Sequence, residues 1–562
     1  MLNELNYKLP ENLERAVHSK FDEWQTENKI KRIWEKDAGV WTNDDEAKWL
    51  GWLDIVERES NDLQKFRDFA EDAKNFSHIV LLGMGGSSLC PEVFSITFGK
   101  KNFHILDSTV PAQIKTLEGK IDLSKTLFIV ASKSGSTLEP NIFKQYFFER
   151  VSEKVGKENA GKQFVAITDP KSKLQKVAEQ GNFRNIFFGD PEIGGRFSAL
   201  SDFGMIPAAA MQIDVEDFFE RTEEMISSCK NENPKENPGA VLGTILGVCQ
   251  TSGRDKLTIF TSKEIYDVGA WLEQLIAEST GKKDISIIPV DREKIGAPED
   301  YGDDRIFAYL KLKDSSDNSL DEKIDALEKS AQPVVRIEVA DRMNIGQEFF
   351  RWEFATAVAG AIMRINTFNQ PDVESAKIEA KKLTEEYEKT GKLPDEKPFY
   401  EADGIKLFTD EKNVAELNKL LDGEKSLANY LKAHLSRVKT GDYFAILAYI
   451  ENNREDEDAL QKIRHQVFEE KRVATCLGFG PRFLHSTGQA YKGGSNEGVF
   501  LQITSDDAED LQVPDQKYTF GVVKAAQACG DVQVLWDRNR RAWRVHLGKD
   551  VKISLEKISS MI

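Results

Sequence analysis

The feature that most constrains the fold is an apolar run that ends abruptly in glycine and serine. Residues 79–82 (Ile-Val-Leu-Leu) are followed directly by Gly-Met-Gly-Gly-Ser-Ser at residues 83–88. Apolar residues with a β-branched start are typical of a strand buried on both faces, and the glycines let backbone N–H groups approach a ligand closely. If Pro91 opens a helix, its N-terminus adds partial positive charge at the same point. The stretch therefore predicts a phosphate-binding turn.

A second stretch repeats this pattern. Residues 127–131 (Leu-Phe-Ile-Val-Ala) end in Ser-Lys-Ser-Gly-Ser-Thr at residues 132–137. Each loop alone is weak evidence, because loops rich in serine and glycine are often only turns. In parallel sheets, however, ligands bind beyond the carboxyl ends of the strands. Two hydroxyl-rich strand ends therefore predict one phosphorylated ligand between them.

From residue 77 the pattern alternates between strand and helix. Candidate strands are residues 79–82, 103–106, 127–131, 164–168 and 185–188. The helical intervals, such as residues 140–155 and 171–180, are long enough for parallel crossovers. This part of the chain therefore predicts a doubly wound α/β domain.

Further segments flank that domain. A second α/β unit is expected, with strands at residues 257–261, 285–289, 306–311 and 334–339 and helices at residues 265–279 and 344–365. Trp, Leu, Glu and Lys at roughly helical spacing predict a helical layer before residue 75. After an acidic helix and connector at residues 374–412, strands are expected at residues 443–449, 475–479, 499–504, 532–536 and 543–546. The predicted domains are residues 1–75, 76–215, 216–400 and 401–562.

Composition and charge narrow the classes of partner. The chain has 562 residues, too many for one compact core, and a formal net charge of −18. Nucleic-acid binding needs clustered Lys and Arg, so this charge argues against it, whereas a small anionic substrate is still allowed. The five cysteines lie far apart without metal-ligand spacing, so neither disulfides nor a zinc site is expected.

No targeting or membrane segment is expected. The first residues, Met-Leu-Asn-Glu-Leu, have neither the basic start nor the apolar core of a signal peptide. The longest apolar stretch, residues 239–249, is shorter than the ~20 residues that a membrane span requires. The expectation is a cytoplasmic protein without membrane partners.

Three ordered motifs lie downstream of the two loops. They are Gly-Gly-Arg-Phe-Ser at residues 194–198, Glu-Ser-Thr-Gly-Lys at residues 278–282, and Asn-Thr-Phe-Asn-Gln-Pro-Asp-Val-Glu-Ser-Ala-Lys at residues 366–377. Together with the two loops they resemble the glucose-6-phosphate isomerase family over residues 77–377. The tail at residues 477–489 resembles the isomerase half of bifunctional transaldolase/glucose-6-phosphate isomerase fusions. Because the chain before residue 77 is too short for a transaldolase barrel, isomerase activity alone is expected.

The resemblance implies two SIS-type parallel-sheet domains and an aldose–ketose isomerase without metal or cofactor. Such an enzyme interconverts glucose 6-phosphate and fructose 6-phosphate through a cis-enediol. By motif position Glu278 is the base, Arg196 stabilises the enediolate, and Lys377 assists ring opening. Glutamate suits the base role if burial lifts its pKa toward the working pH. The plain alternatives are a structural ion pair of Arg196 with Asp202 or another acid, and a solvated Lys377.

Phosphate and sugar contacts complete the predicted site. The candidate substrate-binding residues are Gly85, Gly86, Ser87, Ser132, Ser134, Thr137 and Gln274. Hydroxyls and backbone N–H groups can surround phosphate oxygens without a metal. Lys133 matches a lysine of the family loop and could equally be a solvated charge.

The chain departs from the family at the ring-opening histidine. Where many members have Gly-Gln-His, this sequence reads Gly-Gln-Glu at residues 346–348. Glutamate transfers protons but has a lower unperturbed pKa than histidine, ~4.3 against ~6.5. His485, in a polar loop after a predicted strand, is the first candidate for the role, and Glu348 is the second.

Two other functions and an oligomeric state stay open. The chain could isomerise a related sugar phosphate, of mannose or an amino sugar, or it could be a non-catalytic sugar-phosphate sensor built on SIS domains. Family members commonly form dimers with shared active sites, so a homodimer is implied by the resemblance. The extended tail could instead fill the space of a partner subunit.

Overall fold

The computed structural model describes residues 1–562, apart from the side chains at positions 373 and 374. Its first sheet consists of β2 (His78–Leu82), β3 (Phe103–Leu106), β4 (Thr126–Ala131), β5 (Phe164–Thr168) and β6 (Asn185–Phe188), all parallel in the order β3-β2-β4-β5-β6. The segments between and after them form α5 (Leu89–Thr97), α6 (Pro111–Glu118), α7 (Leu138–Val155), α8 (Lys157–Ala160), α9 (Lys173–Gln180) and α10 (Asp202–Ala210). All six residues of β4 are buried, as expected of a strand covered on both faces.

The second sheet has the order β1-β10-β9-β7-β8, in which β1 is Glu4–Lys8. Its parallel strands are β7 (Lys256–Thr261), β8 (Ile288–Asp291), β9 (Arg305–Leu312) and β10 (Val334–Val339), and its helices are α11 (Val215–Cys229), α12 (Pro238–Thr251), α13 (Val268–Thr280), α14 (Asp321–Lys329) and α15 (Ile345–Ile362). Helices α12 and α15 pack closely, because a Cβ at Gly243 would lie 2.4 Å from the Ala355 carbonyl oxygen.

The N-terminal layer is helical, with one exception. It contains α1 (Glu11–Thr26), α2 (Lys29–Trp34), α3 (Ile55–Glu59) and α4 (Leu63–Ala73). The prediction of a purely helical layer is wrong at its start, where β1 (Glu4–Lys8) pairs antiparallel with β10. Leu5 and Tyr7 alternate with exposed residues and pack on the core, and this period-2 pattern is too short to stand out from a helical one.

The C-terminal segment forms a third sheet in the order β11-β12-β16-β15-β13-β14. Its strands are β11 (Tyr400–Ala402), β12 (Ile405–Phe408), β13 (Tyr443–Tyr449), β14 (Ala474–Phe479), β15 (Gly498–Thr504) and β16 (Arg541–His546). Its helices are α16 (Val373–Thr390), α17 (Glu411–Leu420), α18 (Leu427–Leu435), α19 (Arg454–Lys471), α20 (Gly488–Gly493), α21 (Phe520–Asp537) and α22 (Val551–Ser559).

Two expectations for this segment are wrong. Residues 532–536, expected as a strand, form the last turns of α21, because a short apolar run does not by itself separate a strand from a buried helix. The expected connector before residue 412 contains β11 and β12.

The predicted class is otherwise confirmed: two SIS-type parallel-sheet units, a largely helical N-terminal layer and an α/β tail. The predicted domain boundaries stay a prediction.

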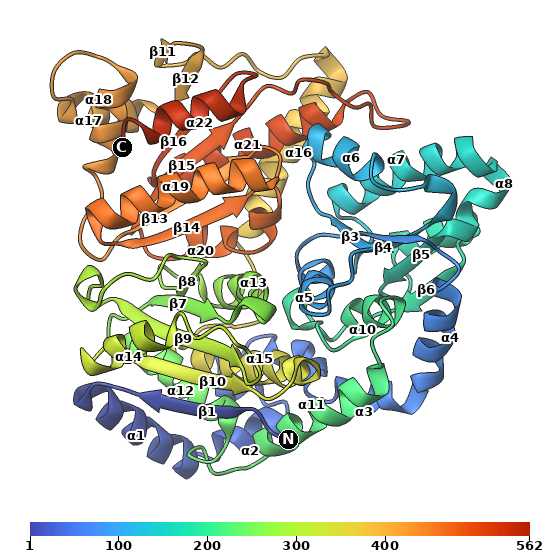
Figure 1. Cartoon of the computed structure of the whole chain (residues 1–562), viewed down its shortest axis with the longest axis vertical. Helices are drawn as coiled ribbons and strands as arrows, with labels where there is room; N and C mark the ends of the chain where they lie inside the picture. The colour runs from blue at the N-terminus through green and yellow to red at the C-terminus, as the bar shows by residue number, and fades with distance from the viewer.

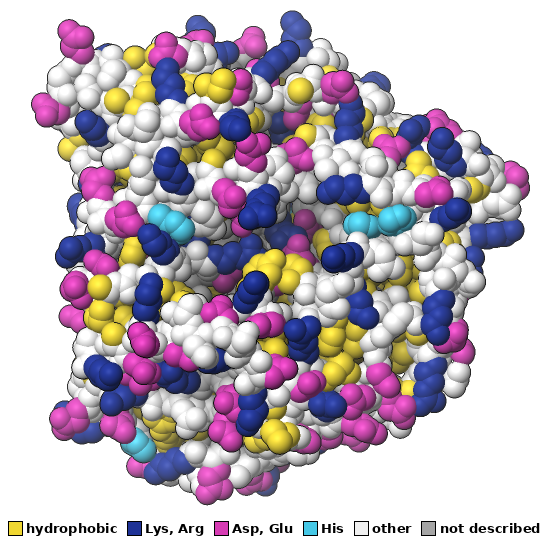
Figure 2. All heavy atoms as spheres, in the orientation of Figure 1, with side chains coloured by type: hydrophobic (Ala, Val, Ile, Leu, Met, Phe, Trp, Pro, Cys, Tyr) yellow, Lys and Arg dark blue, Asp and Glu magenta, His cyan; other side chains and the backbone are white. Residues whose placement is uncertain are grey.

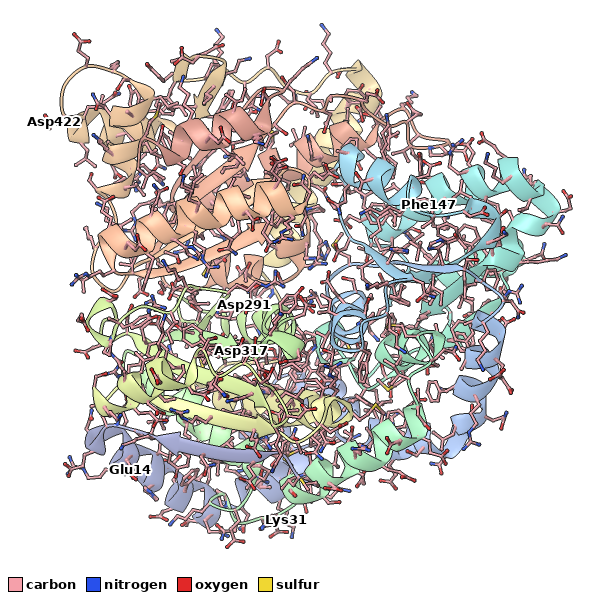
Figure 3. All side chains as sticks on the ribbon, viewed as in Figure 1. Glu14, Lys31, Phe147, Asp291, Asp317 and Asp422 are labelled. Carbon is pink, nitrogen blue, oxygen red and sulfur yellow. The ribbon has the colours of Figure 1, made fainter. Side chains whose placement is uncertain are left out.

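The three sheets surround a common junction (Figure 1). In this view the third sheet lies above the second, and the first unit lies beside both. Strand β14 meets the edge of the second sheet, where the Thr475 backbone N–H donates to Glu293 Oε1 at 2.8 Å. Asp291, at the end of β8, lies at this junction, whereas Phe147 lies inside the first unit and stacks on Phe128 (Figure 3).

The surface carries charges of both signs. Acidic and basic side chains are interspersed over the visible face, and Lys and Arg side chains gather in a hollow where the units meet (Figure 2). Among the residues that the structure describes, none of the helices combines the length and the apolar character that a membrane crossing requires.

Candidate active site

The glycines after β2 allow three segments of the chain to meet. Gly85 has φ +56°, and a Cβ there would lie 2.8 Å from Gln274 Nε2 and 2.9 Å from the His485 carbonyl oxygen. A Cβ at Gly86 would lie 2.1 Å from the Gly195 carbonyl oxygen. Any larger side chain at either position would force these segments apart. The glycine-serine turn is therefore a contact point with the Gly-Gly-Arg motif and with the tail.

The loop after β4 has a similar construction. Gly135 has φ +63°, and a Cβ there would lie 2.2 Å from the Leu174 backbone nitrogen. The Ser132 hydroxyl donates to Thr137 Oγ1 at 3.4 Å, and the loop then enters the 18-residue helix α7. The N-terminus of a helix presents backbone N–H groups and partial positive charge, which favour an anion.

One cavity of about 180 Å³ lies between these loops. Its lining contains eleven of the residues nominated from the sequence: Gly85, Gly86, Ser87, Ser132, Ser134, Thr137, Arg196, Gln274, Glu278, Lys377 and His485. Lys133, Gln370 and Gly195 also line it. These residues come from all three sheet units, so the fold brings together positions that lie far apart in the sequence.

The guanidinium of Arg196 is fixed in one orientation. Its Nε donates to Ser279 Oγ at 2.7 Å, and its Nη2 donates to the backbone carbonyls of Thr367 at 2.5 Å and Asn369 at 3.1 Å. Its Nη1 donates to Gln370 Oε1 at 3.1 Å and lies 3.8 Å from Glu278 Oε2. Burial lowers the pKa of Arg196, and the charge of Glu278 opposes that shift. Four hydrogen bonds thus aim a positive charge at Glu278.

The alternative pairing of Arg196 with Asp202 does not occur. Asp202 forms its ion pair with Lys65, whose Nζ lies 2.7 Å from Asp202 Oδ1. Burial, reinforced by Glu59, raises the pKa of Asp202 to about 7 despite that partner.

Glu278 lies near the end of α13 and is 5 % exposed. Gln274, one turn earlier on the same face, donates from Nε2 to Glu278 Oε2 at 3.2 Å and to the His485 carbonyl oxygen at 2.7 Å. Gln274 therefore connects the carboxylate to the loop that carries His485.

His485 follows β14 and reaches the cavity from the third sheet unit. Its Nε2 lies 3.1 Å from Glu139 Oε1, in the first turn of α7. Burial would raise the pKa of Glu139, but the charge of His485 and its hydrogen bond hold that pKa below its usual value. The pair joins an imidazole to an ionised carboxylate, an arrangement that orients a histidine for proton transfer.

With this geometry established, known proteins provide a comparison. The family model described as phosphoglucose isomerase matches residues 61–303. Over these residues the chain is similar to that family. Two relatives are a probable glucose-6-phosphate isomerase of Methanococcus maripaludis, 27 % identical over 58 % of this chain and 82 % of the relative, and a glucose-6-phosphate isomerase of Methanocaldococcus jannaschii, 27 % identical over 58 % of this chain and 91 % of the relative.

Solved structures show the same fold. A hypothetical protein, TT0462, from Thermus thermophilus superposes with a TM-score of 0.59 at 23 % identity, covering 67 % of this chain and 99 % of that protein. A glucose-6-phosphate isomerase from Chlamydia trachomatis superposes with a TM-score of 0.50 at 20 % identity, covering 63 % of this chain and 77 % of that protein. The resemblance of residues 477–489 to transaldolase fusions stays a prediction.

The two candidates for the ring-opening residue occupy different places in the structure. His485 lines the cavity, whereas Glu348 does not. Glu348 is fully buried in α15, where Oε1 accepts from Asn3 Nδ2 at 2.8 Å and lies 3.4 Å from Arg351 Nη1. The structure therefore gives Glu348 a core position beside the N-terminus.

The two lysines that line the cavity, Lys377 and Lys133, differ in their surroundings. Lys377, in α16, lines the cavity, and its charge helps to lower the pKa of Glu139. Glu374, a neighbour in the same family motif, has its side chain outside the described residues. Lys133 is not simply a solvated charge, because its Nζ donates to Asp169 Oδ1 and to the Asp190 carbonyl oxygen, each at 2.8 Å.

Three residues of the site were not nominated from the sequence. Gln370 belongs to the third motif, which suggested no separate role for it, and it accepts a hydrogen bond from Arg196. Lys282 ends the second motif and, fully buried, donates to the carbonyls of Ser279 at 2.9 Å and Asn366 at 2.6 Å, so it joins the second and third motifs. Glu139 has no sequence signal, because acidic residues are common in first helical turns.

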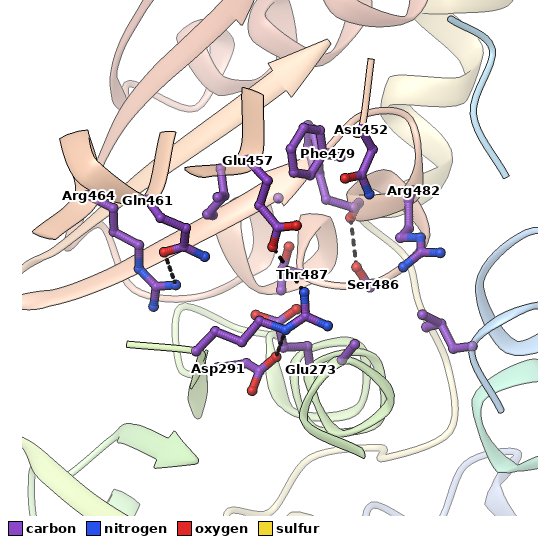
Figure 4. Close-up of a pocket in the computed structure, with 16 residues that line it drawn as sticks. Glu273, Asp291, Asn452, Glu457, Gln461, Arg464, Phe479, Arg482, Ser486 and Thr487 are labelled. Carbon is purple, nitrogen blue, oxygen red and sulfur yellow. Dashed lines mark hydrogen bonds and ion pairs between the residues drawn. The ribbon is translucent and has the colours of Figure 1, made fainter. Parts of the chain in front are cut away.

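A second, charged cavity lies behind the histidine loop (Figure 4). Arg482 lines it and anchors the loop to the first unit, with Nε 2.7 Å from Asp107 Oδ2 and Nη1 2.6 Å from Glu92 Oε2. Arg292 also lines the cavity and pairs with Asp291, whose Oδ2 lies 3.4 Å from the Arg292 Nε. Burial and Asp291 raise the pKa of Glu273 to about 8. The arginines and carboxylates of this cavity are largely paired with one another. Through Arg482 these ion pairs hold the loop that carries His485 in place.

Proposed function

We propose that the chain interconverts glucose 6-phosphate and fructose 6-phosphate, with Glu278 as the base. The observation that carries the proposal is the convergence of Glu278, Arg196 and His485 on one cavity with the two glycine-serine loops. The names of the similar curated proteins support the same reaction. An aldose–ketose conversion needs a phosphate anchor, a base, a charge stabiliser and a ring-opening group, and the cavity offers a candidate for each.

The phosphate binds at the loop end of the cavity. Ser87, Ser132, Ser134 and Thr137 supply hydroxyls there, and the start of α7 supplies backbone N–H groups. This arrangement holds a phosphate by hydrogen bonds and partial charges. Anchoring the substrate at one end converts a bimolecular encounter into an oriented one, which is a large part of catalysis.

Glu278 transfers the proton between the two carbons. It removes the proton from C2 of the open-chain aldose and returns a proton to C1 after the enediol forms, while the hydroxyl proton of O2 passes to O1. Negative charge develops on the oxygens during this step, and the fixed guanidinium of Arg196, 3.8 Å from Glu278, is placed to stabilise it without reorganisation.

His485 opens the ring. A ring-opening group must donate a proton to the ring oxygen and accept one from the anomeric hydroxyl, which an imidazole can do near neutral pH. Glu139 holds one ring nitrogen of His485, so the other is directed to the sugar. Lys377 contributes a positive charge on the same side of the cavity. The homodimer and the predicted domain boundaries remain part of this proposal.

A charge-neutral substitution of the base tests the function. We expect Glu278→Gln to lower the turnover of glucose 6-phosphate by about 10²–10⁴-fold, the usual contribution of a general base, while calorimetric binding of the sugar phosphate changes little. Glu273→Gln is the matched control, because it lies on the same helix but faces the second cavity. Turnover retained by Glu278→Gln would remove Glu278 from the base role. Parallel assays on mannose and amino-sugar phosphates define the specificity.

A further inference from the structure

We propose that Gln527 is a positioning residue for ring opening, whose side-chain amide holds Glu139 in the orientation that His485 requires. The inference rests on the proposed function and adds to it a residue of the third sheet unit. Gln527 lies on α21 and is 3 % exposed, so its amide must find its partners inside the protein.

Two donors converge on one carboxylate oxygen. Gln527 Nε2 donates to Glu139 Oε1 at 2.7 Å, and the same oxygen lies 3.1 Å from His485 Nε2. Hydrogen bonds to a carboxylate favour its ionised form. The amide is a neutral donor, so it stabilises the charge of Glu139 without competing with His485 as an ion-pair partner.

A third residue determines which end of the amide faces Glu139. Thr109, fully buried after β3, donates from its hydroxyl to Gln527 Oε1 at 2.7 Å. With its oxygen held there, Gln527 must present its NH₂ group to the carboxylate. Without that bond the amide could turn and place its oxygen against a negative charge. Thr109 therefore selects the amide orientation that supports Glu139.

The chain of contacts crosses between two units of the molecule. It runs from Thr109 in the first unit to Gln527 in the third, back to Glu139 in the first, and again to His485 in the third. Gln527 and His485 both lie outside residues 61–303, the part that matches the family model. The third unit thus supplies the proposed ring-opening group together with one of its supports.

The charges around Glu139 define what a pH experiment reports. His485 faces it from the loop after β14, Lys377 from α16 and Tyr449 from β13. Gln527 is neutral, and so is Tyr449, because burial raises the pKa of Tyr449 well above its usual value. Removing the N–H donor of Gln527 raises the pKa of Glu139, so the acidic limit of ring opening, where Glu139 becomes protonated, moves to higher pH.

The experiment compares ring opening with proton transfer. Exchange between the α and β anomers of glucose 6-phosphate, measured by NMR, reports ring opening alone, and a coupled assay reports isomerisation. We expect Gln527→Ala to slow anomer exchange on the order of tenfold, the effect of one lost hydrogen bond to a charged group, with KM nearly unchanged and the acidic limb shifted upward. Thr109→Val should act in the same direction, and Thr109→Ser, which keeps the hydroxyl, should restore most of the rate.

Gln533→Ala is the control, because Gln533 is exposed on the same helix and donates to Asp537, one turn further along, at 2.8 Å. If Gln527→Ala behaves like Gln533→Ala, or lowers both rates equally with an unchanged pH profile, the positioning role is overturned. If Gln527→Ala does not fold, the Thr109 pair decides the question by the same measurements.

A measurement without turnover separates this inference from the proposed function. The imidazole resonances of His485, assigned with a His485→Gln variant, report how the ring is held in the free protein. We expect them to change in Gln527→Ala and Thr109→Val but not in Gln533→Ala. The wild-type protein could fail both to isomerise and to anomerise glucose 6-phosphate while the two variants still alter the His485 resonances. That result would refute the proposed function and leave the positioning contact standing. Unchanged resonances would refute the positioning contact itself.

Discussion

Gly86→Ala tests whether the contact between the glycine-serine turn and the Gly-Gly-Arg motif sets the geometry of the site. The added Cβ would lie 2.1 Å from the Gly195 carbonyl oxygen and 3.0 Å from the Arg196 backbone nitrogen. An ordinary contact needs more than about 3 Å, so one of the two loops must move by about 1 Å. Both neighbouring atoms belong to backbone, which cannot relieve the clash by a change of rotamer.

The movement is expected to affect catalysis more than folding. Overpacking of this kind costs about 1–3 kcal/mol of stability, which a chain of this size can tolerate. A displacement of about 1 Å in a catalytic group costs about 10²-fold in rate, and the displaced loop carries Arg196. We therefore expect kcat/KM for glucose 6-phosphate to fall about 10²-fold in a protein that still unfolds cooperatively.

The assay pairs steady-state kinetics with thermal unfolding, and the sequence supplies a matched control. A Cβ at Gly194, in the same motif, would meet no atom within 4 Å among the described residues, so Gly194→Ala should retain both activity and stability. Wild-type activity in Gly86→Ala, or an equal loss in Gly194→Ala, would refute the argument that the close approach of these loops sets the position of Arg196.

Two further predictions concern His485 and Glu353. His485→Ala should slow turnover of closed-ring glucose 6-phosphate more than turnover of an open-chain analogue, and equal losses in the two assays would count against a ring-opening role. Glu353 is fully buried in α15, and burial raises its pKa well above the usual value. Its folded pKa exceeds its unfolded one, so its contribution to stability falls as pH rises above the unfolded value. Urea unfolding should therefore show the stability advantage of Glu353→Gln over wild type growing as pH rises above the unfolded pKa of about 4.3, and an advantage that is constant with pH would contradict the assignment.

The sequence predicted the parallel strands well because their signal is local. A run such as Leu127–Ala131 within β4 is apolar throughout and is followed by turn residues, and both features depend only on neighbours in the chain. The sequence did not predict β1, because its pairing with β10 depends on residues far away in the chain, such as Ile337 opposite Leu5. Residues 532–536 were wrongly predicted as a strand, because the prediction considered them without the preceding turns of α21.

The same distinction applies to the site. Motif residues such as Arg196 and Glu278 could be nominated because their neighbours formed a recognisable pattern. Glu139 and Gln527 could not, because their importance arises from one contact between chain positions 388 residues apart. Glu348 was nominated from a motif position, but its surroundings in the core, which the motif does not encode, place it elsewhere.

The placement of His485 in the third sheet unit has a consequence for the synthesis of the protein. A ribosome completes both phosphate loops, Arg196 and Glu278 long before it adds the histidine. A polypeptide released early would therefore contain the proposed phosphate anchor and base without the group that opens the ring. Catalytic competence on the closed sugar would then arise only late in translation, so activity would report that most of the third sheet unit had been made.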